Sequence, residues 1–136
     1  MVNTYLKLKQ TRQKEVDKFP MFFAFNKEQF AEGLKKLNVK QEELISIFGG
    51  GFIRKSDKAK YIMMMDKQDN EHIRMMQDKN YVYNMFRYEL ANHEYCVREE
   101  DEDTLQSLNL TIEDVNKNNL LKEQLMKAKK DYMAQY

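Results

Sequence analysis

The stretch ISIFGGGFIRKSDKAKY, residues 45–61, decides the fold because it fits two different structures. An apolar run is followed by three glycines, Gly49–Gly51, and then by Arg54 and Lys55 before a helical pattern begins. In a phosphate-binding loop of the form G-x-x-x-x-G-K-[ST], a glycine directly precedes the lysine, so that the backbone curls and its amides face the phosphates. Here Arg54 precedes Lys55 and the glycines lie further upstream. The sequence therefore favours a simple turn.

We expect this turn to join two strands, with the glycines supplying the positive φ angles that a tight reversal needs. A second interpretation is anion contact, because Arg54, Lys55 and Ser56 precede a helix N-terminus, where a phosphate or a partner's carboxylate can bind. Arg54 and Lys55 are therefore candidate partner-binding residues. A nucleotide-handling enzyme that uses the loop Gly49–Ser56 stays open as an alternative.

Outward from this turn, the sequence predicts short strands and long helices. MFFAF (residues 21–25) and ELISIF (43–48) are strand candidates, and a third strand begins near Phe52. One proline and four glycines in 136 residues, with many Lys, Glu, Gln, Met and Leu, favour helix elsewhere. The helices are expected over residues 3–17, 27–37, 58–78, 80–92 and 119–135.

The helical patterns also predict which side chains are buried and where helices begin. Asn26 with Gln29 has the pattern of a capping box, and Thr111 with Asp114 caps a short turn. The expected buried faces are Phe30, Leu34, Leu37; Ile62, Met65, Ile73, Met76; Val82, Phe86, Leu90; and Leu121, Leu125, Ala128, Tyr132. The fold class is α+β: a small sheet of two to four strands packed against four or five helices. We expect a single domain over residues 1–136, with a peripheral helix over 1–18 as an option.

The composition indicates a folded protein outside the membrane. Hydrophobic residues make up 42% and charged residues 33% of the chain, too much apolar material for full disorder and too much charge for a membrane protein. The longest apolar runs are far shorter than the ~20 residues of a spanning helix. The first residues show no secretion signal, and the single cysteine, Cys96, fits a reducing compartment. We therefore expect a cytoplasmic protein without a membrane partner.

Charge is distributed unevenly although the net charge is only +1. Residues 1–40 carry nine Lys and Arg against four Asp and Glu, and residues 96–103 carry one Arg against five acids. A protein that grips duplex nucleic acid is usually more basic overall, so we expect no strong direct nucleic-acid binding. A nucleic-acid-binding accessory role of the basic first forty residues stays open as a further alternative.

The acidic run has two interpretations. It is a solvated loop, or it contacts a basic groove on a protein that normally holds nucleic acid. On the second interpretation its members are candidate partner-binding residues: Glu99, Glu100, Asp101, Glu102 and Asp103.

The segment RYELANHEYC, residues 87–96, brings together residue types that bind metals. Glu89 and His93 are i,i+4 neighbours on a helix, and Cys96 follows closely. Imidazole and thiolate are zinc ligands, so Glu89, His93 and Cys96 form a candidate zinc or enzyme site. A structural zinc site usually needs four ligands, and the chain has two histidines and one cysteine in all. The simpler interpretation is that His93 caps the helix and hydrogen-bonds Glu89 while Cys96 is buried, with no cofactor.

Ten methionines are unusual for this length, and three of them, Met63–Met65, are consecutive. Three consecutive positions on a helix cannot all face one core, so at least one is expected to meet solvent or a partner. Methionine suits both irregular cores and adaptable binding surfaces. The sequence leaves open whether the methionine-rich face is core or interface.

Three blocks carry a resemblance to a known family: EVDKFPMFFAFNKEQFAEGL (15–34), GGGFIRKSD (49–57) and FRYELANHEYC (86–96). Over most of residues 15–135 the chain resembles a family of small uncharacterised proteins from phages, plasmids and integrated elements of Firmicutes. That resemblance implies a bacterial cytoplasm and an accessory gene, and it transfers no catalytic residue. Small accessory proteins of such origin often bind a host protein, and inhibitors of CRISPR nucleases (anti-CRISPR proteins) are a prominent class.

The expectation is therefore a protein without enzymatic activity that binds a host defence protein. A Cas9-type nuclease, whose nucleic-acid channel is basic, is the partner that the acidic run would fit. Binding there would block nucleic-acid loading.

Overall fold

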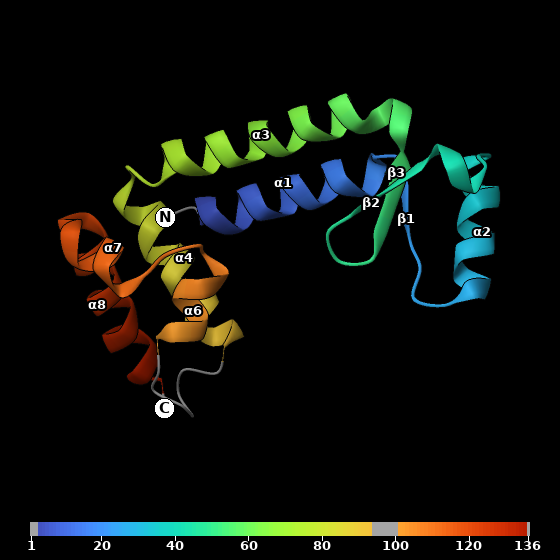
Figure 1. The fold of residues 1–136 in the computed structure, drawn as a ribbon. Helices are drawn as coiled ribbons and strands as arrows, with labels where there is room; N and C mark the ends of the chain where they lie inside the picture. Colours follow the sequence, from blue (N-terminus) through green and yellow to red (C-terminus); the bar gives the residue numbers. More distant parts are fainter. Residues whose placement is uncertain (1–2, 94–100, 136) are drawn as a thin grey trace. The chain divides into compact units, whose positions relative to one another are not determined.

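The structure, a computed structural model, describes residues 3–93 and 101–135. The elements are, in order, α1 (Thr4–Lys18), β1 (Met21–Phe23), α2 (Lys27–Leu37), β2 (Leu44–Ile47), β3 (Gly51–Arg54), α3 (Lys58–Met75), α4 (Lys79–Asn92), α6 (Glu102–Ser107), α7 (Ile112–Lys117) and α8 (Asn119–Met133) (Figure 1). Short 3₁₀ turns cover Gln41–Glu43 and Lys55–Asp57.

The predicted α+β class is confirmed, and the sheet has three antiparallel strands. The described residues form seven α-helices, more than the four or five predicted. The difference comes from two six-residue helices, α6 and α7, which are too short to show an amphipathic period in the sequence. Within the described ranges, no helix combines the length and apolar character needed to cross a membrane.

The chain forms two compact units. The first, called the helical unit, contains residues 1–12 and 71–136, and the second, called the sheet unit, contains residues 13–70. Helices α1 and α3 each contribute residues to both units. The expectation of a single domain stays a prediction.

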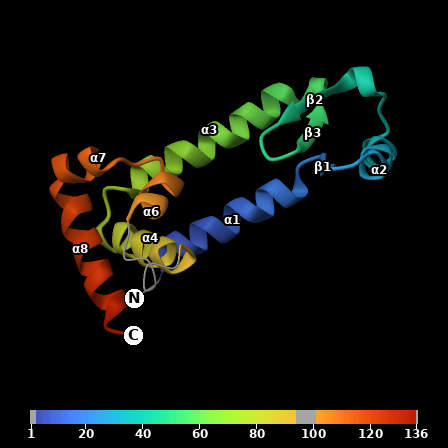
Figure 2. The ribbon, with the colours of Figure 1, turned by 60° about the horizontal axis from the view of Figure 1, so that its bottom comes forward.

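The glycine segment of the sheet unit is a turn between two paired strands, as predicted. The strand order is β1-β3-β2, and the turn at residues 48–50 connects β2 to β3 (Figure 2). Gly49 and Gly50 have φ angles of 80° and 81°, which residues with a Cβ rarely adopt. Because Gly51–Arg54 pairs with strands on both sides, its backbone serves the sheet and does not form a phosphate cradle.

Helix α2 covers one face of the sheet with aromatic contacts. Phe22 stacks on Phe52 at 5.4 Å between ring centroids, and Phe30 meets both rings edge-on. A Cβ added at Gly33 would lie 2.1 Å from the Phe22 ring, so only glycine allows α2 to approach this closely. Leu37 is buried as predicted, whereas Phe30 and Leu34 are half-buried.

The predicted start of α2 is confirmed, with a small difference in geometry. Asn26 is the N-cap, and its side chain accepts a hydrogen bond from the Gln29 N–H at 2.8 Å. The Gln29 side chain accepts from the Phe25 N–H at 2.8 Å, one residue earlier than in a standard capping box. The backbone of Phe25 is thereby fixed just after β1.

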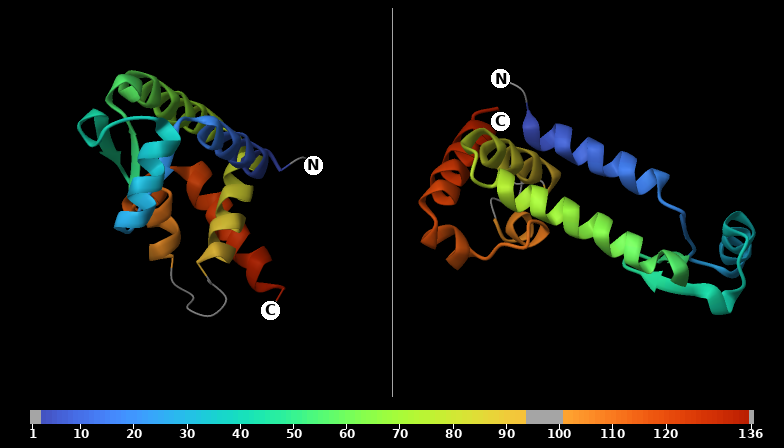
Figure 3. Two further views of the ribbon diagram at one scale, coloured as in Figure 1. Left: turned by 90° about the vertical axis from the view of Figure 1, so that its right-hand side faces the viewer. Right: turned by 90° about the horizontal axis from the view of Figure 1, so that it is seen from above.

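The helical unit contains the larger apolar core. Helix α4 packs along α8, as Figure 3 shows, and the predicted faces of both helices are buried. The core consists of Tyr5, Tyr81, Val82, Met85, Phe86, Leu90, Leu105, Val115, Leu121, Leu125, Ala128 and Tyr132. The predicted cap at Thr111 and Asp114 is confirmed as a reciprocal capping box that begins α7.

The prediction for the face of α3 was wrong for two of its four residues, whereas Met65 and Met76 are half-buried. Ile62 and Ile73 are 46% and 63% exposed, while Gln68 is buried and donates to Glu15 at 3.4 Å. Because the buried position of α3 holds a polar residue, a search for periodically spaced apolar residues does not detect the buried face. Met63 is 72% exposed, which confirms that at least one of the three consecutive methionines meets solvent. The helix ends before Asp78 because Asp78 instead caps α4, accepting from the Tyr81 N–H.

Candidate functional site

Three phenylalanines of the sheet unit project into solvent. Phe23 is 50%, Phe25 76% and Phe48 99% exposed. We call these three residues the phenylalanine surface. Exposed clusters of aromatic side chains are costly in water and mark interaction sites, where aromatic residues are enriched.

The glycine turn holds this surface together. A Cβ added at Gly50 would lie 2.6 Å from Cε1 of Phe25, and one added at Gly51 would lie 3.0 Å from Cε1 of Phe23. Both rings therefore lie against the glycine backbone, and Phe48 is part of the same turn. Gly49 and Gly50 allow the reversal through their positive φ angles, and Gly50 and Gly51 leave room for the rings of Phe25 and Phe23.

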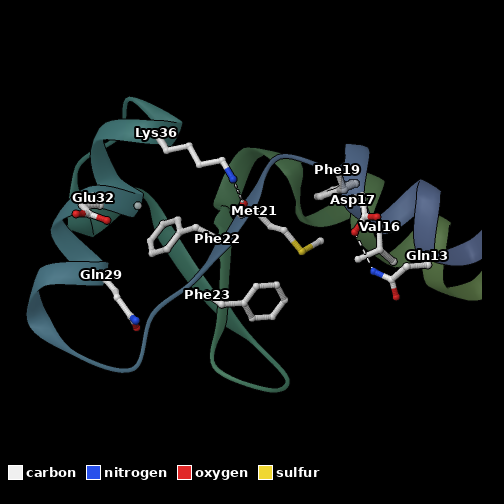
Figure 4. Close-up of a pocket in the computed structure, with 11 residues that line it drawn as sticks. Gln13, Val16, Asp17, Phe19, Met21, Phe22, Phe23, Gln29, Glu32 and Lys36 are labelled. Carbon is white, nitrogen blue, oxygen red and sulfur yellow. Dashed lines mark hydrogen bonds between the residues drawn. The ribbon is translucent and has the colours of Figure 1, made fainter.

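A hollow of about 650 Å³ runs along β1, between the end of α1 and helix α2 (Figure 4). All three residues of β1 line it. The charged side chains on its walls are Asp17 from α1 and Glu32 and Lys36 from α2. The Lys36 ammonium donates to the Met21 carbonyl at 3.5 Å, drawn as a dashed line in Figure 4. The remaining two charges on the walls are both negative.

Arg54, which was predicted to contact an anion, binds groups of the protein itself. The Arg54 guanidinium donates to the Leu37 carbonyl from Nε at 3.3 Å and from Nη2 at 2.7 Å, and its Nη1 lies 3.3 Å from Asp57 Oδ2. The guanidinium therefore supplies hydrogen-bond donors to a carbonyl at the C-terminal end of α2. Lys55 is exposed in the following 3₁₀ turn. Partner binding by Arg54 and Lys55 stays a prediction.

A buried carboxylate in the helical unit gathers several polar groups. Glu89 is 4% exposed, and its Oε1 accepts a hydrogen bond from the Tyr5 hydroxyl at 2.7 Å. Lys9 Nζ lies 3.6 Å from the same oxygen, and Ser107 Oγ donates to Oε2 at 3.4 Å. Burial, together with the hydrogen bond to Glu89, raises the pKa of Tyr5 well above its ordinary value. The Glu89 carboxylate is thus paired and closed off from bulk water.

The structure brings together two of the three predicted zinc ligands. His93 is the C-cap of α4, as the simpler interpretation predicted. Its Nε2 lies 3.5 Å from Glu89 Oε2, but the predicted hydrogen bond between them is not formed. Cys96 lies outside the described residues. In the part of the chain that the structure describes, no group of three His, Cys, Asp or Glu residues has the geometry to hold a metal ion.

The described part of the acidic run is a helix start. Asp101 is the N-cap residue of α6 and forms an ion pair with Lys129, while Glu102 and Asp103 are exposed in the first turn. Acidic side chains in a first turn stabilise a helix through its dipole. Glu99 and Glu100 lie outside the described residues. The run therefore has a structural role at its C-terminal end, and partner binding by it stays a prediction.

Sequence reasoning missed the phenylalanine surface and the Tyr5–Glu89 pair. MFFAF was predicted as one strand, yet β1 ends at Phe23, and only Met21 and Phe22 of the five residues are buried. The signal that could have found the surface is a phenylalanine directly before three glycines, since a turn tip cannot bury Phe48. No local signal connects Tyr5 with Glu89, which are 84 residues apart.

Comparisons with known proteins give a family without a function. A family model described as "Family of unknown function (DUF7659)" matches residues 4–131, and the chain therefore belongs to that family. No curated protein and no solved structure matches the chain.

Proposed function

Because this family has no assigned function, we propose from the structure that the protein acts by binding another protein through the phenylalanine surface. The supporting observation is that Phe23, Phe25 and Phe48 are exposed around one glycine turn. Moving a phenylalanine side chain from water into an apolar contact gives about 1.5–3 kcal/mol. Aromatic side chains, phenylalanine included, are enriched at protein–protein interfaces, where a few residues carry most of the affinity.

Binding is favoured over catalysis by the environment of Glu89. This carboxylate is the most buried acid among the described residues, and Tyr5 and Lys9 already engage it. A general base must reach a proton of its substrate at hydrogen-bond distance, and Glu89 is 4% exposed. The cluster around Glu89 is therefore best explained as a buried structural network.

In its finer form, the proposal is an inhibitor of a host CRISPR nuclease of the Cas9 type, acting in the bacterial cytoplasm by blocking nucleic-acid loading. The resemblance to small proteins of mobile elements supports this partner. So do the exposed acids Glu102 and Asp103, because such nucleases line their channels with basic residues.

The proposal is tested with a purified Cas9-type nuclease in a DNA cleavage assay. The unchanged protein is expected to bind the nuclease and to protect the DNA. The double variant Phe25→Ser/Phe48→Ser should lose at least about tenfold in affinity, since it removes two exposed rings. Met126→Ser is the matched control, because Met126 is 62% exposed on α8 in the helical unit.

Two outcomes separate the general proposal from the finer one. If the unchanged protein neither binds the nuclease nor protects DNA, the nuclease is the wrong partner. A photo-crosslinking residue placed at position 48 or at position 126 in cells then tests the surface itself. Adducts from position 48 alone support protein binding there, and equal or no adducts at both positions overturn it. If Glu102→Lys/Asp103→Lys leaves inhibition unchanged, the acidic contact is wrong.

A further inference from the structure

Among the residues that the structure describes, no strand pairs with one edge of β1, because the sheet order is β1-β3-β2. The direction of its backbone groups follows from one hydrogen bond. Ala24 N–H donates to the Gly50 carbonyl at 3.1 Å, and these two residues continue the β1–β3 register. In antiparallel strands the residues alternate between pointing toward and away from the partner. Phe22 and Ala24 therefore point toward β3, and Met21 and Phe23 point outward.

The outward groups at the two ends of this edge already have partners. Lys36 donates to the Met21 carbonyl, and the Phe25 N–H donates to Gln29 Oε1. Phe23 lies between them, its N–H and C=O point outward at this edge, and the residue lines the hollow. A residue that presents both groups on a sheet edge can pair with one residue of an added strand.

We infer that an extended segment of a partner protein adds to the sheet beside β1 as a fourth strand, with its main chain hydrogen-bonded to Phe23. This inference rests on the proposed function, because Phe23 also belongs to the phenylalanine surface. The hollow, at about 650 Å³, has room for side chains of such a segment. Strand addition would fix the position of the bound protein on the sheet, whereas contact with exposed rings alone would not.

The walls of the hollow indicate the chemistry of the segment. Asp17 accepts from Gln13 at 2.8 Å and, as a carboxylate, can accept further hydrogen bonds. Glu32 is exposed on the opposite wall. Two carboxylates against the single Lys36 ammonium leave the walls with an excess of one negative charge, which complements a positive charge on the segment. The segment should therefore carry a lysine or arginine next to an apolar residue that packs beside Phe19 and Phe23.

The opposite edge of the sheet offers a matched control. The β2–β3 register pairs Ile45 with Ile53 and Ser46 with Phe52. Since Phe52 points toward β1, Ile53 points toward β2, and Ser46 points outward on the far edge. Ser46 therefore has the same backbone orientation as Phe23, but no residue of β2 lines the hollow along β1.

The test uses the full chain and a display library of random ten-residue peptides. Peptides that the unchanged protein enriches are measured against three variants: Phe23→Pro, Phe23→Val and Ser46→Pro. Proline removes the outward N–H without breaking a bond to β3, because edge positions tolerate it. Valine is similar in size to proline and keeps the N–H. Folding of each variant is checked by circular dichroism.

The expected result is that Phe23→Pro weakens peptide binding at least about tenfold relative to Phe23→Val, while Ser46→Pro has little effect. Enriched peptides should contain Lys or Arg, and Asp17→Asn/Glu32→Gln should weaken them. Amide hydrogen exchange should slow at Phe23 on peptide binding. No enrichment, or equal binding by the proline and valine variants, overturns the inference.

Two further outcomes identify a wrong occupant or a wrong site. If the unchanged protein forms dimers that Phe23→Pro dissociates, the edge pairs with a second copy and the partner segment is wrong. If the variant Phe25→Ser/Phe48→Ser loses its protein partner while Phe23→Pro keeps it, the proposed function stands and strand addition is wrong. If neither variant changes partner binding, both proposals fail.

Discussion

The two units use their apolar side chains in opposite ways. Among the described residues, the helical unit buries twelve large or aliphatic side chains in one core, from Tyr5 to Tyr132. The sheet unit buries four: Met21, Phe22, Leu37 and Ile53. Yet the sheet unit exposes three phenylalanines, whereas the exposed apolar residues of the helical unit are scattered over α3, α4, α7 and α8.

This contrast assigns stability and the proposed binding to different parts of the sequence. The twelve core side chains are buried because they recur on one face of each helix. Replacing one of them with a smaller residue lowers the free energy of unfolding. Exposed rings contribute little to folding, and they are available for contact with a partner. The helical unit therefore provides stability, and the sheet unit provides the proposed binding surface.

The largest expected effect comes from comparing one phenylalanine of each unit. Phe86 is fully buried in the core of the helical unit, and Phe48 is 99% exposed. Phe86→Ala should lower the free energy of unfolding by about 3–5 kcal/mol, because it leaves a cavity. Phe48→Ala should change it by less than about 0.5 kcal/mol. Urea unfolding followed by circular dichroism measures both, and similar losses for the two variants would contradict the division of roles.

The next largest effect concerns the buried carboxylate. Glu89→Ala leaves the buried Tyr5 hydroxyl without its acceptor, which should cost about 1–3 kcal/mol. Glu123→Ala is the control, because Glu123 is an exposed acid of the neighbouring helix α8, and it should cost less than about 0.5 kcal/mol. Thermal unfolding of the three proteins in one buffer decides this. Equal stability of the two variants would mean that the Tyr5–Glu89 hydrogen bond contributes nothing.

The same contrast explains how much the sequence could predict. The faces of α4 and α8 were predicted residue by residue, because period 3.6 is visible within one helix and Leu121, Leu125, Ala128 and Tyr132 follow it. The glycine turn was predicted because Gly49 and Gly50 need positive φ. Both are local properties.

The rest depended on contacts between distant segments. Gln68 is buried because it meets Glu15, and Glu89 is buried beneath Tyr5, which no period in either segment indicates. The exposure of Phe23 depends on which strand neighbours β1 and on where β1 ends. Arg54 shows the same dependence on distant segments, since its guanidinium donates to the Leu37 carbonyl, a contact that its charge alone does not predict.

A smaller effect sharpens the role of the glycine turn. Gly49→Ala and Gly50→Ala both force a Cβ into positive φ, so each should lower stability by about 1 kcal/mol. A Cβ at position 49 meets nothing within 4 Å, but one at position 50 meets the Phe25 ring at 2.6 Å. Phe25 is exposed and can rotate away, so only Gly50→Ala should disturb the phenylalanine surface. Equal partner binding by the two variants would show that the position of the Phe25 ring is unimportant.

The smallest effect is a dependence of stability on alkaline pH, and it belongs to the helical unit. Burial raises the pKa of Tyr5 above its ordinary value of 10.0, with the Glu89 hydrogen bond adding to the shift. Burial also raises the pKa of Tyr81 and of Tyr83. Above pH 10 the unfolded chain has therefore released tyrosine protons that the native protein still holds. Because the unfolded state then binds fewer protons, the free energy of unfolding falls as pH rises.

Tyr5→Phe removes one of the hydroxyl groups that lose their proton at a lower pH in the unfolded chain than in the native protein. The variant starts from a lower stability at pH 8, because its hydrogen bond to Glu89 is lost. Between pH 9 and 11, however, its stability should decline less steeply than that of the unchanged protein. Urea unfolding at several pH values gives the two slopes. Parallel slopes would mean that Tyr5 titrates alike in the folded and unfolded states, and that the helical unit does not shield this hydroxyl from water.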